Sequence, residues 1–539
     1  MQTLLHLDLQ PCNIARLMPS DNNHYVSRLL HLRLPRVCVA ITATDADELI
    51  EKAELTARDN PFIELRLDYL ARPAMILPKL REFTESHPQV SVIATCRRVV
   101  SGGKFRGAIP AQLEVLEKAA AAGCQLVDVE IQTAAHVKPA KLDKLRSKAA
   151  VVLSFHDFKG TQKLEETLKK MSSYPADFYK VVSTAASLYD NVTMMKFLET
   201  HQDKYSLVGL CMGEQGIISR ILAVRAGSAF TFGAVAADQK TAAGQVTAQE
   251  LRNTYRIDQV DAATKVYGVA GDPVSYSLSP AIMNVALRRE NVNGVFVALH
   301  VKSLKDLLAC IRDIPIQGLA ITMPHKQAIL RYLDNTDPYT AKIGACNTVV
   351  RSQDGKLYGF NTDTSGVVRP LEQRMTLHDA KILVLGAGGA ARAAVFGLKD
   401  RGAQISILNR SLAAAHKLAR QARARTIKRA DLKRLEFDVI INATPVGMGN
   451  PRESPLNADE IKAKYVFDMV YDPAETRLLK LAKERGAEVI AGSEMFVHQA
   501  ARQFEIWTGK PAPREDMLRI VNQALAERGA AVRNGESSK

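Results

Sequence analysis

Residues 381–393, KILVLGAGGAARA, decide the fold of the second half of the chain. The apolar run at 382–385 predicts a buried strand, the glycines at 386–389 a sharp turn, and the alanine-rich segment that follows a helix. Glycines let the backbone approach a pyrophosphate, and the N-terminus of a helix offers free N–H groups to it. An ordinary tight turn is the alternative, but the strand–turn–helix order favours a dinucleotide-binding site.

The strand expected next, AQISILNRS, indicates which dinucleotide is bound. It ends on Asn409, Arg410 and Ser411. An NAD site usually has an acidic residue at this point, which bonds the ribose 2′-hydroxyl, whereas an arginine suits a 2′-phosphate. The sequence therefore predicts NADP rather than NAD.

The composition is that of an ordinary globular protein, and it excludes several classes. The 539 residues are 47% hydrophobic and 24% charged, enough for about three or four domains. There is no uninterrupted apolar run of about 18 residues, so we expect no membrane span. The net charge is +15, but lysine and arginine are scattered among acids and no aromatic–basic motif occurs. A surface that attracts small anions, or one that is merely solvated, is therefore favoured over nucleic-acid binding.

The cysteines and the N-terminus indicate the compartment. Seven cysteines without a CxxC pair predict reduced thiols and a cytoplasmic protein. Residues 1–34 lack an apolar signal core and predict a poorly ordered leader, with an organelle address as the lesser alternative. No His, Cys or Asp cluster has metal-ligand spacing, so we expect no metal. The sequence does not decide between a monomer and a homodimer.

In the first half, residues 35–250, short β-rich runs alternate with helical stretches. The eight runs are RVCVAIT, FIELRLDYL, VSVIATC, LVDVEIQ, AVVLSFH, DFYKVVS, YSLVGLC and AFTFG. This number predicts a closed (β/α)8 barrel, and an open doubly wound sheet is the alternative. In a barrel, polar residues at the C-terminal ends of the strands form the site.

Charged residues lie inside these predicted strands. Glu64, Arg66 and Asp68 alternate, so a strand would direct all three to one face, either solvated or facing the barrel interior. Lys180 lies in the apolar sixth run. A buried lysine has a lowered pKa and is a nucleophile towards carbonyls, whereas a lysine on an outer face extends to water. The pattern alone does not decide between the two.

These residues belong to motifs that resemble the type I 3-dehydroquinate dehydratases. The motifs ELRLD, ATCRR, SFHDF, YKVVSTA, CMGEQGIISR, TFGAV and AAGQ occur in this order. The resemblance implies that Lys180 forms an imine with the substrate C3 ketone, and that His156 removes a C2 proton and returns it to the departing C1 hydroxyl. It implies substrate contacts from Glu64, Arg66, Arg97, Arg220, Thr241 and Gln245.

Two positions depart from this family. Many members have a glutamate four residues after the arginine matched by Arg97, and it orients the histidine, but this chain has Ser101. We therefore expect slower dehydration or another orienting group. Thr241 replaces a frequent serine but keeps the hydroxyl.

The motif GDPVSYSLSP opens the second half, after a short linker at 251–264. We expect Ser279 to be a helix N-cap and Pro280 to occupy the first helical position. Ser277 and Ser279 would then place hydroxyls beside free N–H groups, which suits a carboxylate. A capped helix without a ligand is the alternative.

Together with the glycine loop, these motifs resemble shikimate dehydrogenase. The other matches are MPHK, ACNT, NTD, NRS, NATPVGM, DMVYDP and EMFVHQA, while Ala320 stands where members often have asparagine. The resemblance implies that Lys326 and Asp363 form the catalytic pair beside the C3 oxygen, where an ammonium stabilises the alkoxide left by hydride transfer. It implies substrate contacts from Ser277, Ser279, Thr322, Asn347, Tyr471 and Gln499. It implies NADP contacts from Gly386, Ala387, Gly388, Gly389, Ala390, Asn409, Arg410, Ser411, Thr444, Met469 and Gly492.

The predicted architecture is α/β throughout. The barrel is followed by a substrate lobe at 265–370, a Rossmann NADP lobe at 378–490, helices at 491–526 that pack on the substrate lobe, and a disordered tail at 527–539. The two resemblances together imply a bifunctional enzyme that dehydrates 3-dehydroquinate and then reduces 3-dehydroshikimate to shikimate with NADPH. The alternatives are an active reductase fused to a weakly active barrel, a dehydrogenase for quinate, or a non-catalytic metabolite sensor.

Overall fold

The computed structural model describes residues 34–536, except 237, 239–240, 243 and 275. Almost all of the predicted leader, residues 1–34, lies outside the described residues. The described chain forms two compact units, one mainly of residues up to 264 and one mainly of residues from 265 onward. In the described part of the chain, no helix combines the length and the hydropathy needed to cross a membrane.

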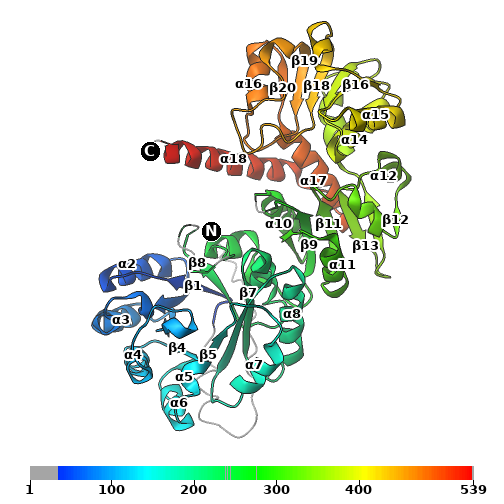
Figure 1. Cartoon of the computed structure of the whole chain (residues 1–539). Helices are drawn as coiled ribbons and strands as arrows, with labels where there is room; N and C mark the ends of the chain where they lie inside the picture. Colours follow the sequence, from blue (N-terminus) through cyan, green and yellow to red (C-terminus); the bar gives the residue numbers. More distant parts are fainter. Residues whose placement is uncertain (1–33, 237, 239–240, 243, 275, 537–539) are drawn as a thin grey trace, which may run out of the picture. The chain divides into compact units, whose positions relative to one another are not determined.

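The first unit is a parallel barrel (Figure 1). Its strands are β1 (Val37–Ile41), β2 (Phe62–Arg66), β3 (Ser91–Thr95), β4 (Leu126–Glu130), β5 (Ala150–His156), β6 (Phe178–Thr184), β7 (Leu207–Met212) and β8 (Thr231–Ala234). Because β1 pairs with both β2 and β8, the sheet curls into a near-closed ring. At the remaining seam, the Ala229 N–H donates to the Leu207 carbonyl at 2.8 Å. The barrel prediction is confirmed, and the open sheet is excluded.

Helices follow the strands around the barrel. They are α2 (Ala46–Ala57), α3 (Leu77–Ser86), α4 (Ile109–Ala121), α5 (Ile131–Ala134), α6 (Pro139–Arg146), α7 (Leu164–Met171), α8 (Tyr189–His201) and α9 (Ile217–Leu222). Helix α7 shows why they pack as they do. Leu164, Leu168 and Met171 are buried on one face, at helical spacing, while the charged residues between them face outward.

The second unit begins with a mixed sheet of order β10-β9-β11-β13-β14-β12. Its strands are β9 (Lys265–Gly271), β10 (Gly294–His300), β11 (Ile316–Ile321), β12 (Asn335–Thr336), β13 (Thr348–Arg351) and β14 (Leu357–Phe360). The helices along this stretch are α10 (Ser279–Arg289), α11 (Leu304–Asp313), α12 (Pro338–Ile343) and α13 (Asp363–Glu372). Strand β13 runs antiparallel to both of its neighbours, so a hairpin continues the otherwise parallel sheet.

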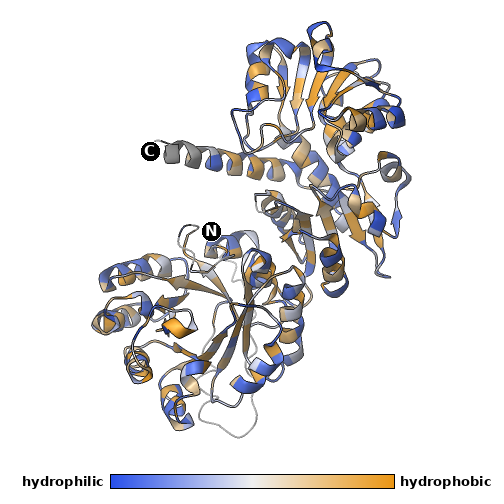
Figure 2. Cartoon of the chain, viewed as in Figure 1, coloured by the Kyte–Doolittle hydropathy of each residue, from blue (hydrophilic) through white to orange (hydrophobic). Residues whose placement is uncertain are grey.

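A second, all-parallel sheet of order β17-β16-β15-β18-β19-β20 forms the cofactor lobe. The strands are β15 (Lys381–Leu385), β16 (Gln404–Leu408), β17 (Arg425–Thr426), β18 (Phe437–Asn442), β19 (Ala463–Asp468) and β20 (Glu488–Ile490), and the helices are α14 (Gly389–Lys399), α15 (Leu412–Ala422) and α16 (Arg477–Glu484). This is the doubly wound order of dinucleotide-binding folds, with the switch point between β15 and β18. Separate apolar clusters cover its two faces, and Figure 2 shows hydrophobic residues concentrated on its strands.

Two long helices, α17 (Gly492–Thr508) and α18 (Arg514–Glu536), end the described chain. Phe496 and Phe504 of α17 and Met517 of α18 join one apolar cluster with Tyr267 of β9, so these helices pack on the substrate lobe. Helix α18 continues to Glu536, and the predicted disordered tail from residue 527 is wrong for the described residues. The segment AERGAAVRN is rich in helix-forming alanine, glutamate and arginine and has no proline, which explains the continuation.

Candidate active sites

Inward-facing residues form two layers inside the barrel. An apolar layer is made by residues that include Phe62, Ile93, Leu126, Val152 and Phe178. Two positions further along the same strands stand Glu64, Thr95, Asp128, Ser154 and Lys180, all buried. Because side chains on a strand repeat with period two, the second set forms a polar layer directly above the first.

Lys180 lies at the centre of this polar layer. Its Nζ is 3.1 Å from Asp128 Oδ2, 3.6 Å from Glu64 Oε1 and 3.9 Å from the centroid of the Phe232 ring. Contacts with residues of β2 and β4, which are not neighbours of β6, are possible only inside the barrel, and the outward-facing alternative is excluded. The sequence predicted apolar surroundings for Lys180, but its nitrogen lies beside two carboxylates and one aromatic ring.

Asp128 is a residue of the site that the sequence analysis missed. Its carboxylate accepts hydrogen bonds from Arg97 Nη2 at 2.9 Å, Lys180 Nζ at 3.1 Å and Ser154 Oγ at 2.7 Å. Burial opposes ionisation, but the charges of Arg97 and Lys180 outweigh burial and lower the pKa of Asp128. The alternating charges of LVDVE gave the same signal as those of ELRLD and could have identified it.

His156 ends β5 and is part-buried. Burial lowers the pKa of His156 well below its ordinary value, and the charges of Arg97 and Lys180 add to this effect. The imidazole is therefore neutral at pH 7, which is the form that accepts a proton. Ser101 bonds Gln132 Oε1 at 3.3 Å, while Phe158 stacks on His156 with the ring centroids 6.4 Å apart.

The other predicted residues of the barrel are also buried, except Thr241, which is partly exposed. Arg66 donates to both carboxylate oxygens of Asp68, at 2.9 and 2.8 Å, which raises the pKa of this guanidinium despite its burial. Arg220 on α9 is 2% exposed, and burial lowers its pKa to about 10, so it remains cationic at pH 7. Gln245 Oε1 accepts from the N–H and the hydroxyl of Thr241, at 2.8 and 3.1 Å.

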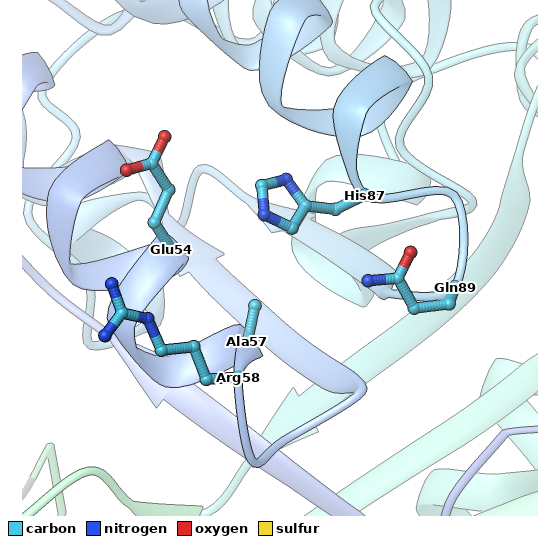
Figure 3. Close-up of a pocket in the computed structure, with 5 residues that line it drawn as sticks. All are labelled: Glu54, Ala57, Arg58, His87 and Gln89. Carbon is cyan, nitrogen blue, oxygen red and sulfur yellow. The ribbon is translucent and has the colours of Figure 1, made fainter.

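A surface pocket of the barrel lies away from these residues (Figure 3). It is lined by Glu54, Ala57, Arg58, His87 and Gln89. These residues end α2 or precede β3, so the pocket lies at the N-terminal ends of the strands, opposite the end where barrels carry their chemistry. We assign no function to it.

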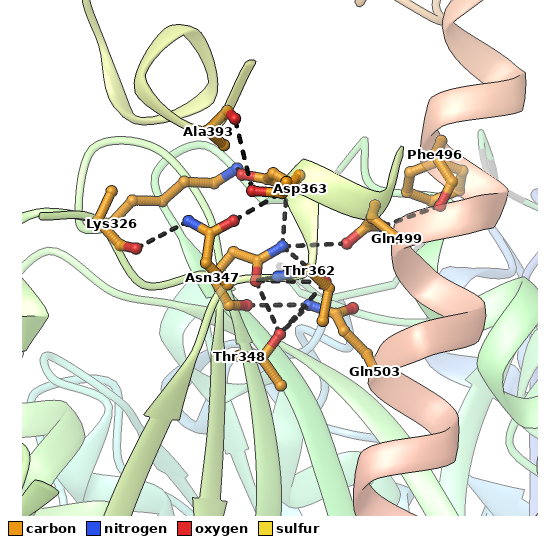
Figure 4. A network of polar contacts seen from close by, with 12 residues as sticks. Lys326, Asn347, Thr348, Thr362, Asp363, Ala393, Phe496, Gln499 and Gln503 are labelled. Carbon is orange, nitrogen blue, oxygen red and sulfur yellow. Dashed lines mark hydrogen bonds and ion pairs between the residues drawn. The ribbon is translucent and has the colours of Figure 1, made fainter. Parts of the chain in front are cut away.

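In the second unit, Lys326 and Asp363 form an ion pair (Figure 4). Lys326 lies in the loop after β11, and Asp363 is the first residue of α13. Asn347 Nδ2 donates to Asp363 Oδ1 at 2.8 Å and to Thr362 Oγ1 at 2.9 Å. The carboxylate is 2% exposed and held by two donors, and the start of a helix further favours a negative charge there.

Asn347 also connects this pair to α17. Its Nδ2 lies 3.4 Å from Gln499 Oε1, and Gln503 Nε2 donates to its backbone carbonyl at 2.9 Å (Figure 4). The fold thus brings four predicted residues together from segments far apart in the chain. Gln503, which the sequence analysis missed, fixes the backbone of Asn347.

The serine motif departs in detail from the prediction. Helix α10 already includes Ser279 as its first residue, with Leu278 as N-cap, so Pro280 is the second helical residue rather than the first. The side chain that accepts a helix N–H is Ser277, from Ser279 at 3.2 Å. The predicted cap was wrong by one position because the proline fits either of the first two helical positions. Thr322 follows β11, and its N–H donates to the Ala270 carbonyl at 2.9 Å.

The glycine loop fits a dinucleotide. Gly386 has a φ of +113°, and a Cβ on it would lie 3.0 Å from the Ala443 carbonyl oxygen. Nothing lies within 4 Å of a Cβ built on Gly388, and no side chain caps α14 there. This leaves open space in front of free helix N–H groups, as a pyrophosphate requires. A Cβ on Gly389 would lie 3.1 Å from Lys326 Cβ, so the loop passes beside the ion pair.

The other predicted cofactor residues surround the ends of the same strands. Ala387 and Ala390 belong to the glycine loop, while Asn409 Nδ2 donates to the Ser411 carbonyl at 3.0 Å. Buried Asn442, which the sequence analysis did not select as a contact, accepts from the Thr444 hydroxyl at 2.7 Å and from the Met469 N–H at 3.0 Å. A Cβ on Gly492 would lie 2.5 Å from the Val470 carbonyl oxygen, so glycine is required there.

Arg410 provides a test of the cofactor assignment. It is exposed at the end of β16, where a ribose 2′-phosphate is expected. We expect Arg410→Ala to raise the KM for NADPH about ten- to a hundredfold, because loss of a charge-assisted hydrogen bond weakens binding by about this factor. The KM for NADH, which has no 2′-phosphate, should change little. Steady-state kinetics with NADPH and with NADH measure both KM values. Arg420→Ala, at an exposed position of α15, is the control. Equal changes for both cofactors would contradict the assignment.

Asp468, at the end of β19, gives a pH-dependent prediction. It is fully buried, and burial raises its pKa from 3.8 to about 6, although hydrogen bonds from Thr476, Val470 and Asn442 oppose this. The folded chain therefore binds the carboxyl proton of Asp468 more tightly than the unfolded chain does. This proton binding stabilises the folded chain at low pH, and the stabilisation is lost as the pH rises through about 6. Between pH 3.5 and 7, we therefore expect the free energy of unfolding of Asp468→Asn to rise by about 3 kcal/mol relative to that of the native chain.

Urea unfolding of both proteins across this pH range measures the difference. Asp459→Asn, at an exposed position of the same lobe, is the matched control and should show no such pH dependence. A difference between Asp468→Asn and the native chain that stays constant with pH would show that the pKa of Asp468 is the same in the folded and unfolded chains.

These features define the class of the protein. A barrel with a buried lysine between carboxylates is joined in one chain to a dehydrogenase-type unit with a lysine–aspartate pair beside a dinucleotide loop. The molecule is therefore a two-site α/β enzyme that combines lyase and oxidoreductase chemistry. In the described residues, no three His, Cys, Asp or Glu side chains gather as a metal-binding group.

Comparison with known families agrees with this class. The family model described as type I 3-dehydroquinase matches residues 37–262. Models of the shikimate dehydrogenase substrate-binding domain, of shikimate/quinate 5-dehydrogenase and of the shikimate 5′-dehydrogenase C-terminal domain match residues 269–349, 370–449 and 492–521.

One relative carries the same combination, and two others each match about half of this chain. The chloroplastic bifunctional 3-dehydroquinate dehydratase/shikimate dehydrogenase of Arabidopsis thaliana is 34% identical over 511 residues, which cover 90% of this chain and 84% of the relative. The shikimate dehydrogenase (NADP(+)) of Nitrosopumilus maritimus is 39% identical over 48% of this chain and 98% of its own length. Shikimate 5-dehydrogenase of Thermus thermophilus, solved with NADP(H) and shikimate, is 34% identical over 49% of this chain and all of its own, with a TM-score of 0.46. The chain belongs to the bifunctional 3-dehydroquinate dehydratase/shikimate dehydrogenase family.

Proposed function

We propose that the chain catalyses two consecutive steps of the shikimate pathway. The barrel dehydrates 3-dehydroquinate to 3-dehydroshikimate, and the second unit reduces this product to shikimate with NADPH. The observation that carries the proposal is the presence in one chain of two separate lysine–carboxylate centres, one buried in the barrel and one partly buried in the second unit, each suited to a carbonyl substrate. The non-catalytic sensor predicts that such reactive groups are lost, and it is disfavoured for that reason.

In the barrel, Lys180 is the nucleophile. Its amine attacks the C3 ketone, water leaves, and the resulting iminium withdraws electrons from C2. Neutral His156 removes the C2 proton, and the electron pair moves to expel the C1 hydroxyl, which takes the same proton and leaves as water. Hydrolysis of the imine then releases the product. Asp128 and Glu64, within 3.1 and 3.6 Å of the lysine nitrogen, stabilise the positive charge on the iminium.

The buried arginines bind and place the substrate of the barrel. Arg220 is cationic, buried and suited to a carboxylate, which it binds as a planar fork. Arg97, held by Asp128 at 2.9 Å, together with Glu64, Arg66, Thr241 and Gln245 contacts the hydroxyls of the ring. Stacking of Phe158 on His156 orients the imidazole in this chain, where Ser101 replaces the glutamate of many relatives.

In the second unit, the bound NADPH supplies the hydride. The ammonium of Lys326 stabilises the alkoxide that forms at C3 and then protonates it, while the ion pair with Asp363 holds the lysine in place. Asn347, Thr322 and Gln499 bind the ring hydroxyls, and Ser277, Ser279 and Tyr471 the carboxylate side. The cofactor is held by the loop at 386–390, by Asn409, Arg410 and Ser411, and by Thr444, Met469 and Gly492.

A coupled assay tests the proposal. Purified protein is mixed with 3-dehydroquinate and NADPH, without any other enzyme, and NADPH absorbance is followed. Steady loss of NADPH is expected. Loss only after addition of 3-dehydroshikimate would mean that the barrel is impaired, and no loss with either substrate would overturn the enzymatic function. Oxidation of quinate with NADP+, measured separately, distinguishes a quinate dehydrogenase.

A further inference from the structure

Arg528 connects three segments of the second unit. It lies on α18, and its Nη1 donates to the backbone carbonyl of Tyr276 at 3.1 Å and to Asp472 Oδ2 at 2.5 Å. Tyr276 belongs to the loop after β9 in the substrate lobe, and Asp472 to the loop after β19 in the cofactor lobe. One guanidinium on the last helix therefore joins loops that come from different sheets.

Both loops carry residues that we assign to the substrate. Tyr276 directly precedes Ser277, and Asp472 directly follows Tyr471. Burial raises the pKa of Tyr471, and the charge of Arg528 and hydrogen bonds of the phenol with the Leu278 backbone and the Ser277 side chain oppose this rise. The Tyr471 ring also stacks on Phe496 of α17, with the centroids 4.5 Å apart. We call the two hydrogen bonds of Arg528, to Tyr276 and Asp472, the Arg528 tie. Both bonded residues are sequence neighbours of Ser277 and Tyr471, which make the direct contact between the two loops.

We propose that Arg528 is a positioning residue that holds Tyr471 against the loop after β9, which carries Ser277. It thereby pre-forms the part of the reductase site that binds the substrate carboxylate. This inference rests on the proposed function of the second unit. Without the tie, the two loops have to be ordered when the substrate binds, and that entropic cost appears as weaker binding. The hydride-transfer centre at Lys326 and Asp363 is built from other segments, so the chemical step should be little affected.

The geometry of the tie matters more than its charge. The Arg528 and Asp472 side chains are each 36% exposed, and a solvent-exposed ion pair contributes little by itself. A guanidinium, however, is a rigid planar fork that can hold two acceptors in a fixed relation, which an ammonium does not do. Arg528→Lys keeps the positive charge near an anionic substrate but loses this geometry, and therefore separates positioning from simple electrostatic attraction.

The test uses the full chain. We expect Arg528→Ala to raise the KM for 3-dehydroshikimate about tenfold, with kcat and the KM for NADPH changed less than twofold. Arg528→Lys should restore only a small part of the loss. Asp472→Asn should act in the same direction, and the double variant should be no worse than Arg528→Ala, because both substitutions break one tie. Arg519→Ala, on the same helix and paired with Asp516, is the matched control.

A binding measurement separates this inference from the proposed function. Shikimate should raise the thermal unfolding midpoint of the native chain and of Arg519→Ala, and raise it much less in Arg528→Ala, whose helix content is checked by circular dichroism. An unchanged KM, a full rescue by lysine, or additive effects of the two substitutions would each overturn the positioning role. A native chain that binds shikimate but does not oxidise it would instead refute the proposed reaction.

Discussion

Lys180→Met should abolish dehydration of 3-dehydroquinate, lowering kcat by about 10⁴-fold or more, while reduction of 3-dehydroshikimate continues at its normal rate. Methionine preserves the length of the side chain but has no nucleophilic nitrogen, so no imine can form. Two assays on one preparation measure this, one following the enone product of dehydration and the other NADPH. The retained reductase activity serves as an internal control for folding of the second unit.

Substitution of Lys180 also removes the cation between Glu64 and Asp128. Loss of one partner of a buried charge pair costs about 3–5 kcal/mol, so a lower unfolding temperature of the barrel is expected as well. A chemical test therefore supplements the kinetics. Borohydride added with 3-dehydroquinate should attach the substrate covalently to the native chain and to His156→Asn, but not to Lys180→Met. Lys170→Met, at an exposed position of α7, is the matched control, and covalent trapping in Lys180→Met would refute the assignment.

Lys326→Met should lower the kcat of the reductase about 10³-fold and leave the KM for NADPH and the dehydratase activity unchanged. The alkoxide at C3 would then lose both the charge that stabilises it and its proton donor. Asp363→Asn should have a smaller effect in the same direction, because the ammonium of Lys326 remains but loses the carboxylate that positions it. The double variant should be no slower than Lys326→Met alone, since the two residues act as one unit.

The control for this pair is Lys342→Met, at an exposed position of α12, where the lysine pairs with Asp400. Normal reductase activity is expected from it. If Lys326→Met raised the KM for 3-dehydroshikimate and left kcat intact, the lysine would be a binding residue rather than the proton donor. Independent, additive effects of Lys326 and Asp363 would likewise exclude the paired mechanism.

Local patterns in the sequence were sufficient for the order of elements. Each of the eight β-rich runs contains a barrel strand, and the run at 381–393 is the predicted strand, turn and helix, because strand and helix periods and glycine turns are properties of neighbouring residues. The second strand ends at Arg66, however, so Asp68 lies in a 3-10 helix and not on a strand face with Glu64 and Arg66. The same locality explains two errors. Whether α10 begins at Ser279 or at Pro280, and whether α18 continues past residue 527, depends on small differences in free energy that no short pattern records.

Neighbouring residues are therefore sufficient to predict the strands and helices, the nucleotide loop and the reactive residue types. Which charged groups meet depends instead on contacts between distant segments. Asp128 reaches Lys180 across 52 residues of sequence, Asn347 approaches Gln499 across 152, and Arg528 reaches Tyr276 across 252. These contacts depend on closure of the barrel and on packing of the last helices, and the burial that follows from them makes each carboxylate and cation require its partner.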